Sequence, residues 1–238
     1  MEKKKEKFIL ITFILILFAI NYPYLDNALK ESLEGQTTQT IFVDRVIDGD
    51  TIESNGTSIR LLGINTPERG EFLYAEAKAF LEQEILNKQV TLEFVGERTD
   101  KYYRTLAYIH SNYENINVKI VQNGFANPYT YSGKDKYSND LEEAWTTCLQ
   151  KKVNLCEPSA NICSECINVN SNSIINSCSF SCDINGWTIK GEGRAKFMFE
   201  GTLGIGKERD FNLSLENSGG SLYLRDKAGG LVRFEAKR

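Results

Sequence analysis

The sequence predicts an α+β protein in which a small Greek-key β-barrel with covering helices is followed by an all-β region. Three observations lead to this expectation. Short β-branched runs bounded by Asp-Gly, Asn-Gly and similar turns fill residues 40–110. Apolar residues at helical spacing interrupt and follow these runs. After a stretch rich in Ser, Asn and Cys, the chain from Ile167 onward again alternates as strands do, with regularly spaced glycine turns.

Residues 1–25 combine a lysine-rich start with an almost unbroken apolar run from Phe8 to Ile20. This pattern is typical of an export signal or a signal-anchor. The strict run of thirteen residues is short for a membrane-spanning helix, whereas counting through Leu25 gives eighteen, near the lower limit. Because no clear small-x-small cleavage site follows, we favour an uncleaved anchor with the lysines inside. We therefore expect an extracytoplasmic chain, membrane-anchored or secreted, in which the polar residues 26–38 form a linker.

The globular part divides into two expected domains. A barrel domain covers residues 39–158, and an all-β domain covers residues 166–238. Between them, the composition changes, and residues 159–165 are expected to form a linker. The strands of the barrel are expected in "TIFVDRVIDGDTIES", "TSIRLLGI", "QVTLEFVG" and "TLAYIH".

Two segments of the barrel domain have the apolar spacing of helices. Apolar residues recur every three to four positions from Leu73 to Ile85. Similar spacing in "SNDLEEAWTTCLQKKV" predicts a second helix, for which Asn139 and Glu142 would form a capping box. The lone histidine, His110, falls on an expected strand and is interpreted as an ordinary surface or core residue.

All six cysteines lie between Cys148 and Cys182. With an export signal, an even number of cysteines usually means disulfides, because extracytoplasmic compartments are oxidising. The alternative is a four-thiolate zinc site formed by Cys163, Cys166, Cys178 and Cys182. We favour disulfides, whose pairing the sequence does not reveal.

The charges of the two domains exclude binding of nucleic acid through a broad positive field. Residues 37–158 contain 13 Lys and Arg against 18 Asp and Glu, a net charge of −5. Residues 163–238 contain 10 against 9, a net charge of +1. Neither segment would hold a polyanion by bulk counterion release. A polyanion would have to be bound by a few local groups or by a metal ion.

Charged residues interrupt two strand-like runs of the barrel. Asp48 and Asp50 lie two residues apart, so in extended geometry both carboxylates face one side, where a cation would stabilise them. Arg60 lies within the apolar run "SIRLLGI", where its guanidinium needs a carboxylate or a phosphate. A plain Asp-Gly turn, and a structural salt bridge from Arg60 to Asp48 or Glu68, are the simpler explanations. Together with Glu68 and Arg104, however, these residues offer what phosphodiester hydrolysis needs: oxygen ligands for a hard ion, a carboxylate for water and guanidinium groups for phosphate.

Four motifs occur together over residues 40–156: "IDGDT", "RLLGINTPE", "RTDKYYRTLAYI" and "VQNGFANPYTY". In this order and with nearly this spacing, they resemble the staphylococcal nuclease or thermonuclease family. The resemblance implies an OB-fold barrel and an endonuclease that acts on DNA and RNA. It also implies a divalent metal ion, usually Ca²⁺, and products with 3′-phosphate ends.

By position in these motifs, the resemblance implies a role for each candidate residue. Arg60 and Arg104 would bind the scissile phosphate, and Arg104 would also assist the leaving oxygen. Glu68 would position or deprotonate the attacking water. Asp50 would give a carboxylate to the metal ion, and Thr66 a backbone carbonyl. The remaining matches fall on nucleotide-contacting positions: Lys101, Tyr102, Tyr129 and Tyr131.

Three features depart from the family pattern. Asn65 stands where the family has a second acidic metal ligand, so this position keeps an oxygen but loses a formal charge, and metal affinity is expected to fall. The loop after "NTPE" is short, and Tyr103 stands where the best-known member has glycine. The alternative to a nuclease is therefore a catalytically silent module on the same barrel that binds nucleic acid or protein.

The C-terminal domain resembles a small Ig-like β-sandwich of the lamin-tail type. The resemblance depends on "CDINGWTIKGEG" and "LENSGGSLYLRDKAGGLV". Such domains are interaction modules, so the resemblance implies a binding partner of unknown identity. Trp187 is expected in the core of this domain. We see no catalytic cluster in this half of the sequence, and we expect the protein to be a monomer.

Overall fold

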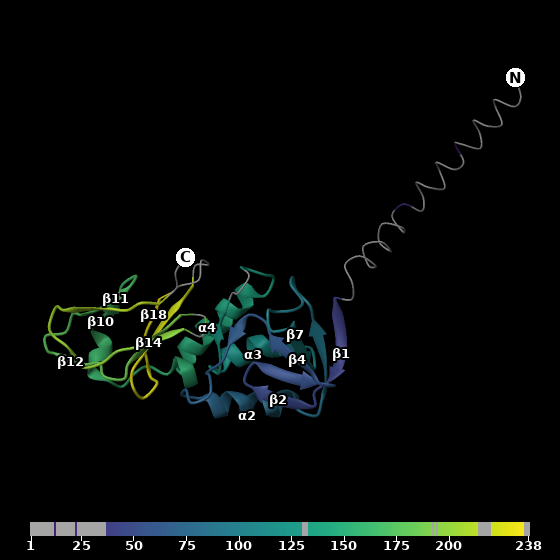
Figure 1. Cartoon of the computed structure of the whole chain (residues 1–238), viewed down its shortest axis with the longest axis horizontal. Coiled ribbons are helices and arrows are strands. Elements are labelled where there is room, and N and C mark those ends of the chain that lie inside the picture. The colour runs from purple at the N-terminus through teal and green to yellow at the C-terminus, as the bar shows by residue number, and fades with distance from the viewer. Residues whose placement is uncertain are drawn as a thin grey trace, which may run out of the picture. The chain divides into compact units, whose positions relative to one another are not determined.

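The structure is a computed structural model of the chain (Figure 1). The expected signal or anchor at residues 1–25 and the linker at 26–38 lie almost wholly outside the described residues, so both stay predictions. Within the part of the chain that the structure describes, no helix is long and apolar enough to cross a membrane. Residues 40–238 form one compact unit, to which the following description applies. The described residues are 12, 22, 37–129, 133–191, 193, 195–213 and 220–235.

The sheet of the barrel domain is built from β1 (Thr38–Phe42), β2 (Arg45–Asp48), β3 (Thr51–Ser54), β4 (Thr57–Leu61), β6 (Gln89–Glu93), β7 (Thr105–Ser111) and β8 (Glu114–Asn115). The strand order is β1-β6-β7-β4-β3-β2, and β8 pairs with β7. β4 and β7 run in parallel, whereas β2–β3, β3–β4 and β6–β7 are antiparallel. β1 and β2 are consecutive in the chain but stand at opposite ends of the order, so the sheet closes on itself as a small barrel.

Apolar alternation decides which face of each strand lies inside the barrel. Ile52 of β3 and Ile59 of β4 are partners in the register, and both are buried. Asn55 and Gly56, with φ angles of 47° and 73°, make the turn between these strands, because such tight hairpins need two residues with positive φ. The four expected strand segments are confirmed.

Three α-helices of the described residues belong to the barrel domain (Figure 1). α2 (Tyr74–Ile85) confirms the first expected helix. α3 (Ile116–Gln122) was not predicted from the sequence. Its Asn115 cap accepts a hydrogen bond from the N–H of Val118. Seven residues are too few for apolar periodicity to separate a helix from a strand, which is why this helix was missed.

α4 (Ser138–Lys151) confirms the second expected helix, but the proposed capping box is wrong. Asn139 and Glu142 both lie within the helix rather than at its start. The start is instead supported by Asp135. Its carboxylate accepts hydrogen bonds from the N–H of Tyr137 and the hydroxyl of Ser138.

The C-terminal region is all-β, as expected. A four-stranded sheet has the order β14-β13-β17-β18, a three-stranded sheet has the order β10-β11-β16, and β12 pairs with β15. Trp187 is almost fully buried in the core of this region, as expected. The strands are β10 (Ile167–Val169), β11 (Ser173–Asn176), β12 (Cys182–Asp183), β13 (Thr188–Lys190), β14 (Lys196–Met198), β15 (Thr202–Leu203), β16 (Glu208–Asp210), β17 (Leu222–Arg225) and β18 (Leu231–Glu235). The predicted fold class, an α+β barrel followed by a small β-sandwich, is confirmed.

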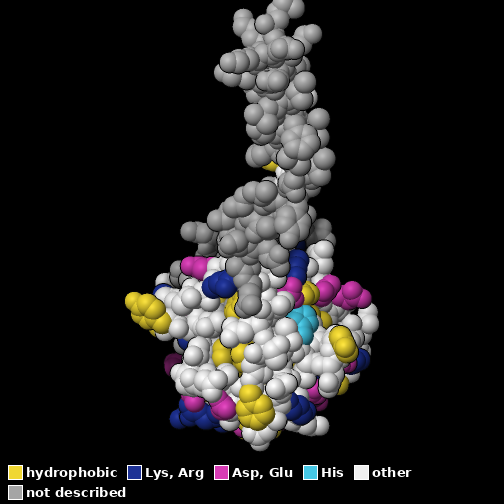
Figure 2. All heavy atoms as spheres, turned by 90° about the vertical axis from the view of Figure 1, so that its right-hand side faces the viewer, with side chains coloured by type: hydrophobic (Ala, Val, Ile, Leu, Met, Phe, Trp, Pro, Cys, Tyr) yellow, Lys and Arg dark blue, Asp and Glu magenta, His cyan; other side chains and the backbone are white. Residues whose placement is uncertain are grey.

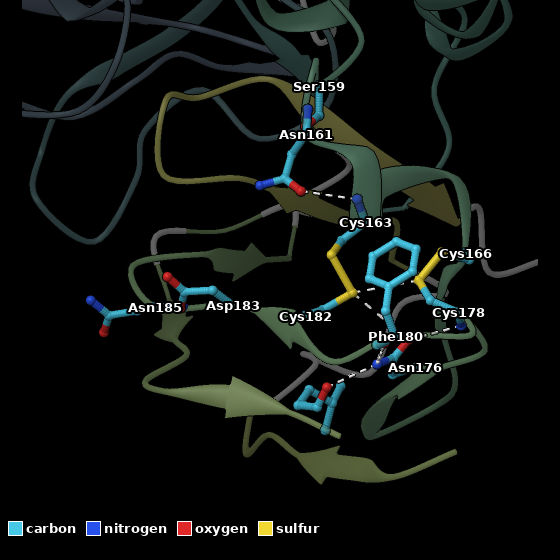
Figure 3. The surroundings of a disulfide bond; sticks show 11 residues. Ser159, Asn161, Cys163, Cys166, Asn176, Cys178, Phe180, Cys182, Asp183 and Asn185 are labelled. Atoms are coloured by element: carbon cyan, nitrogen blue, oxygen red, sulfur yellow. Dashed lines mark hydrogen bonds between the residues drawn. A yellow bond between two sulfur atoms is a disulfide. The ribbon is translucent and has the colours of Figure 1, made fainter. Parts of the chain in front are cut away.

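The expected disulfides are confirmed, and the zinc alternative is wrong because its four cysteines are joined in two disulfides. Figure 3 shows how the Asn176 side chain braces this cluster. It accepts a hydrogen bond from the N–H of Cys178 and donates one to the carbonyl of Phe180. The pairs are Cys148–Cys156, Cys163–Cys182 and Cys166–Cys178.

The C-terminal region packs on α4 of the barrel domain. The ring of Trp145 lies 5.4 Å from that of Tyr223 and 5.6 Å from that of Phe234, both edge-on. Tyr223 therefore belongs to the hydrophobic core of the barrel, although it lies on a strand of the C-terminal sheet. The domain boundaries at residues 159–165 and the lamin-tail assignment stay predictions.

Candidate active site

The Asp48-Gly49-Asp50 turn joins β2 to β3 and lies against Thr66. A Cβ atom at Gly49 would come within 2.9 Å of the Thr66 and Ala77 side chains, so only glycine allows this close approach. The glycine of this motif thus does more than permit a turn. It brings the Asp50 carboxylate into hydrogen-bonding distance of Thr66.

Asp50 is held rigidly. One carboxylate oxygen accepts hydrogen bonds from the backbone N–H and the hydroxyl of Thr66, both at 2.9 Å. The same oxygen lies 3.1 Å from a guanidinium nitrogen of Arg60, and the other oxygen accepts the Thr51 hydroxyl at 3.1 Å. Asp50 is only 6% exposed, so its charge is compensated by these groups rather than by water.

Arg60 is buried at the end of β4, with 8% of its surface exposed. Its guanidinium donates hydrogen bonds to the backbone carbonyls of Leu61 at 2.8 Å and Ile64 at 2.9 Å. The sequence suggested, as the simpler alternative, a structural salt bridge from Arg60 to Asp48 or Glu68. The ion-pair partner in the structure is Asp50. Arg60 is therefore a fixed cation whose position is set by the barrel wall.

A cavity of about 340 Å³ opens beside Arg60. Its lining comes from β4, from the turn before β7, from the segment after β9 (Asn127–Pro128) and from the start of α4. The pairing of β9 with β5 (Ile64–Asn65), and a hydrogen bond from the N–H of Tyr129 to the carbonyl of Gly63, hold the third of these segments in place. Six of the predicted site residues line this cavity: Arg60, Asn65, Lys101, Tyr102, Arg104 and Tyr129.

Arg104 reaches the cavity from a turn that Asp100 organises. The Asp100 carboxylate accepts hydrogen bonds from the backbone N–H groups of Tyr102 and Arg104 and forms an ion pair with the Arg104 side chain at 2.7 Å. Burial alone would raise the pKa of Asp100, but these hydrogen bonds outweigh burial and lower it. Lys101 and Arg104 both lie over the Tyr102 ring, at 5.2 and 5.5 Å from its centre.

The same turn explains why a glycine is found at the position of Tyr103 in the family's best-known member. Tyr103 has a φ angle of 63°, in the left-handed region that favours glycine, and its side chain is 90% exposed. The turn therefore keeps its shape at a local conformational cost, and the extra ring points to solvent.

Asn65 is buried and contacts two parts of the molecule. Its amide oxygen accepts a long hydrogen bond of 3.5 Å from Arg60. Its amide nitrogen donates a hydrogen bond of 3.3 Å to the carbonyl of Gly193 in the C-terminal region. An aspartate could not make the second contact, because an ionised carboxylate has no hydrogen to donate.

The remaining predicted residues are not all brought to the cavity. Among the described residues, the lining does not include Asp50, Thr66 or Glu68. Asp50 is buried and pairs with Arg60, Thr66 is buried and donates to Asp50, and Glu68 is half-buried on the segment that follows β5. Tyr131 lies outside the described residues. The structure thus brings the candidate phosphate-binding and nucleotide-binding residues together around one cavity. Arg60 links this cavity to the candidate metal ligands through its ion pair with Asp50.

The candidate metal ligands fit a hard cation in the type of donor. Asp50 offers a carboxylate, Asn65 an amide oxygen and Thr66 a backbone carbonyl, and calcium is bound by such oxygens. Among the described residues, the only three acidic, histidine or cysteine ligand atoms within 4.8 Å of one another belong to disulfide-bonded cysteines. An ion here would therefore depend on the Asn65 and Thr66 oxygens. Burial, and after it the neighbouring charge of Asp50, raise the pKa of Asp48.

Several residues of this region were not singled out from the sequence. Asp100 lies inside a motif, and an aspartate that accepts the N–H two residues further on is a common turn signal. Glu71, Lys190 and Gly193 had no such signal, because their contacts join segments more than a hundred residues apart.

The surface charges agree with binding of a polyanion by a few local groups rather than by a broad positive field. Figure 2 shows basic and acidic side chains interspersed on one face of the molecule. An OB-type barrel with two arginines, a lysine and tyrosines around one cavity defines a protein that binds phosphodiesters.

Comparison with known proteins gives the family. The family model described as staphylococcal nuclease homologue matches residues 58–157. A thermonuclease from Staphylococcus intermedius is 31% identical over 167 residues, covering 66% of this chain and 99% of that protein. One from Staphylococcus hyicus is 30% identical over 166 residues, covering 65% and 98%. The SPbeta prophage-derived endonuclease YokF of Bacillus subtilis (strain 168) is 29% identical over 127 residues, covering 48% and 43%. The chain belongs to the staphylococcal nuclease family, and its enzyme class is that of a nuclease, a hydrolase.

Proposed function

We propose that the protein is an extracytoplasmic, metal-dependent endonuclease that hydrolyses phosphodiester bonds of DNA and RNA and leaves 3′-phosphate ends. The observation that carries this proposal is the arrangement of Arg60 and Arg104 around one cavity together with Lys101 and the rings of Tyr102 and Tyr129. Guanidinium groups bind phosphate through paired N–H donors, and aromatic rings stack on nucleobases. The cavity therefore suits a nucleotide whose phosphate lies between the two arginines.

The two arginines would have different tasks. Arg60 is fixed by two backbone carbonyls and Asp50, so it would hold a non-bridging phosphate oxygen with little rearrangement. Arg104 is held by a single carboxylate, Asp100, at the rim of the cavity. It would stabilise the negative charge that develops on the leaving oxygen.

Glu68 is the candidate general base. It would accept a proton from the attacking water as the water oxygen forms its bond to phosphorus and the bond from phosphorus to the 5′ oxygen breaks. A Ca²⁺ ion held by Asp50, Asn65 and Thr66 would supply charge neutralisation at the phosphate. The phosphate then stays on the 3′ oxygen, and the 5′ oxygen leaves as a hydroxyl after it takes a proton from solvent.

We also infer that the chain acts outside the cytoplasm. The three disulfides support this, since such bonds persist in oxidising compartments. The lysine-led apolar segment at residues 1–25 would export the chain or anchor it. The C-terminal region would be an interaction module of the lamin-tail type, and the protein would work as a monomer.

The test is a cleavage assay of residues 37–238 on DNA and RNA with Ca²⁺, with other divalent ions and with a chelator. Cleavage that needs an ion, yields 3′-phosphate ends and is lost in Glu68→Gln supports the proposal. Robust cleavage in the chelator would exclude the metal dependence, and 5′-phosphate ends would exclude the assigned leaving group.

A catalytically silent binding module is the second candidate, and one observation favours it. Asn65 lacks the charge of an acidic ligand, and its amide nitrogen is bound to the carbonyl of Gly193. If the module is silent, no ion supports cleavage, yet single strands bind tightly, Tyr129→Ala abolishes binding and Glu68→Gln changes nothing.

A further inference from the structure

The strands β13 and β14 of the C-terminal sheet form a hairpin. The residues on either side of its loop, and Gly193 and Ala195 within the loop, contact the region of the candidate active site. Lys190, the last residue of β13, lies 2.9 Å from the carboxylate of Glu71. Lys196, the first residue of β14, lies 2.9 Å from the other oxygen of the same carboxylate. Gly193 accepts the hydrogen bond from Asn65 and, with Ala195, lines the cavity that contains Arg60 and Arg104.

Glu71 connects this hairpin to the candidate general base. The oxygen that pairs with Lys190 also accepts a hydrogen bond of 2.9 Å from the N–H of Glu68. The N–H of Glu71 donates in turn to the carbonyl of Glu68 at 2.8 Å. The backbone at Glu68 is thus closed into a tight turn by a carboxylate that the two lysines neutralise.

A second contact of the C-terminal region packs against the same segment. A Cβ atom at Gly229, in the turn between β17 and β18, would come within 2.5 Å of the Phe72 ring. This turn therefore packs directly against the segment that carries Glu71. β17 pairs with β13 and packs on α4 through Tyr223 and Trp145, so the hairpin has a fixed support.

The electrostatics agree with a strong link. Burial alone would raise the pKa of Glu71. A hydrogen bond from the N–H of Glu68, the charge of Lys190 and hydrogen bonds from Lys190 and Lys196 instead lower it to about 2. The carboxylate is therefore ionised at any pH at which the enzyme would work. Lys190 is mostly buried, with 14% of its side chain exposed, whereas 43% of Lys196 is exposed. The Lys190 pair is thus the better shielded from solvent and salt.

We propose that the β13–β14 hairpin is a working part of the nuclease site, in which Lys190 and Lys196 are positioning residues that act through Glu71 to fix the segment carrying Glu68. The inference rests on the proposed function, because it concerns the residue assigned there as general base. It gives the C-terminal region a positioning role at the active site in addition to any partner it binds. The hairpin also completes one wall of the substrate cavity through Gly193 and Ala195.

The test uses the same chain, residues 37–238, and measures kcat and KM separately on a DNA substrate with Ca²⁺. The double variant Lys190→Ala/Lys196→Ala should lower kcat about 10- to 100-fold, because a catalytic group misplaced by about 1 Å costs that much. KM should change little, since neither lysine is assigned to the substrate. The conservative variant Lys190→Arg/Lys196→Arg should restore most of the kcat. Lys207→Ala removes an exposed lysine from the same region and should behave as wild type.

A graded series at Glu71 keeps the proposal testable if the double variant fails to fold. Glu71→Gln keeps an oxygen for the Glu68 N–H but loses the charge, whereas Glu71→Ala loses both. The kcat should therefore fall further in Glu71→Ala than in Glu71→Gln, with thermal melting recorded to show that each variant is folded.

Three outcomes would overturn the proposal while leaving the nuclease assignment intact. Unchanged kcat in folded lysine variants would mean that the hairpin packs against the barrel without positioning Glu68. A rise in kcat would mean that the hairpin obstructs the cavity. A rise in KM alone, with a weaker dependence on salt, would mean that the lysines contact substrate phosphates directly. If wild type cleaves nothing with any ion, the proposed function itself fails.

Discussion

The barrel domain and the C-terminal region are stabilised by different means. The barrel has a closed sheet and a large continuous core, and its one disulfide lies at the end of α4. The C-terminal region has a smaller core and short strands, and two neighbouring disulfides join its loops. All the residues assigned to chemistry lie in the barrel, at strand ends and turns that the core supports. The difference teaches that catalytic geometry is built where packing is continuous, whereas the second region can influence it only through a few defined contacts.

The largest effect should come from Arg104→Ala, which tests whether the chemistry belongs to the barrel alone. We expect turnover to fall about 10²–10³-fold, the usual cost of losing one electrostatic donor to the transition state. Ground-state binding of substrate should change much less, because the charge that Arg104 stabilises develops only as the leaving oxygen departs. Single-turnover cleavage and equilibrium binding of an uncleavable substrate measure the two quantities.

Arg45→Ala is the matched control for this variant. Arg45 also forms an ion pair on the barrel, with Glu53, but it is exposed and does not line the cavity. Its loss should leave turnover within about twofold, since exposed ion pairs contribute little. Equal losses in the two variants would show that Arg104 acts through stability rather than chemistry.

The next largest effect should come from removing one disulfide from each region and comparing the losses of unfolding free energy. Replacing Cys163 and Cys182 by alanine removes a disulfide of sequence separation 19, and loop entropy predicts a loss of at most about 3 kcal/mol of unfolding free energy, because the Cys166–Cys178 disulfide inside this loop stays closed. Replacing Cys148 and Cys156 opens a separation of 8 and should cost about 2.5 kcal/mol. Chemical denaturation measures both losses.

Hydrogen exchange locates where each loss falls. In the Cys163→Ala/Cys182→Ala variant, amide exchange should speed up in the C-terminal strands and remain slow in β3, β4 and β7 of the barrel. Uniform acceleration in both regions would mean that they unfold as one unit, and the contrast between them would then be wrong.

A smaller effect is expected at Asn65, where the two regions meet. Asn65→Asp should tighten Ca²⁺ binding on the order of 10-fold, a change of about 1.4 kcal/mol, because it adds a ligand charge. Asn65→Ala is the matched variant, since it also loses the hydrogen bond to Gly193 but adds no charge. Isothermal titration with Ca²⁺ should show the highest affinity in the aspartate variant, an intermediate affinity in wild type and the lowest in the alanine variant. Unchanged or weaker affinity in the aspartate variant would remove Asn65 from the ligand set.

Much of the barrel could be predicted from the sequence because its signals are local. Strand alternation and turn residues indicated β2, β3, β4, β6 and β7, and the motifs indicated that Arg60, Lys101, Arg104 and Tyr129 belong to one site. The seven-residue helix α3 was missed and the cap of α4 was assigned to the wrong residues, because short-range capping by Asn115 and Asp135 decides them. The disulfides were expected, but their pairing depends on the folded arrangement.

The contacts between the regions could not be predicted, for a physical reason. Asn65 looked like a weakened metal ligand, and only the folded chain brings the Gly193 carbonyl to its amide. Glu71 and Lys190 are separated by 119 residues, and no periodicity or motif encodes such a pair. A charged side chain on a strand could meet many different partners, depending on how the chain folds. Its actual partner can therefore be identified only from the structure.

The smallest effect concerns the pH dependence of stability at Glu71. Its pKa falls from the ordinary value of 4.5 to about 2, although burial alone would raise it, because of hydrogen bonds and charges from the Glu68 N–H, Lys190 and Lys196. The unfolded chain therefore binds a proton at this carboxylate more readily than the folded protein does. The ionised carboxylate stabilises the fold above pH 4.5, and this contribution is lost as the pH falls from 4.5 towards 2. Burial lowers the pKa of Arg225, a further cation that interacts with Glu71, only to about 10, so Arg225 stays protonated over this window.

Glu71→Gln should remove this dependence. Wild type should exceed the variant in unfolding free energy on the order of 1 kcal/mol at pH 5, after allowance for solvent screening, and the gap should close by pH 2. Denaturant unfolding at pH 5, 4, 3 and 2 measures the gap. In a Lys190→Met/Lys196→Met background, the same Glu71→Gln change should produce a smaller gap, because only the hydrogen bond from the Glu68 N–H is left to lower the pKa. A gap that persists unchanged without the lysines would mean that Glu71 is stabilised within the barrel alone, and the two regions would then not be coupled through this carboxylate.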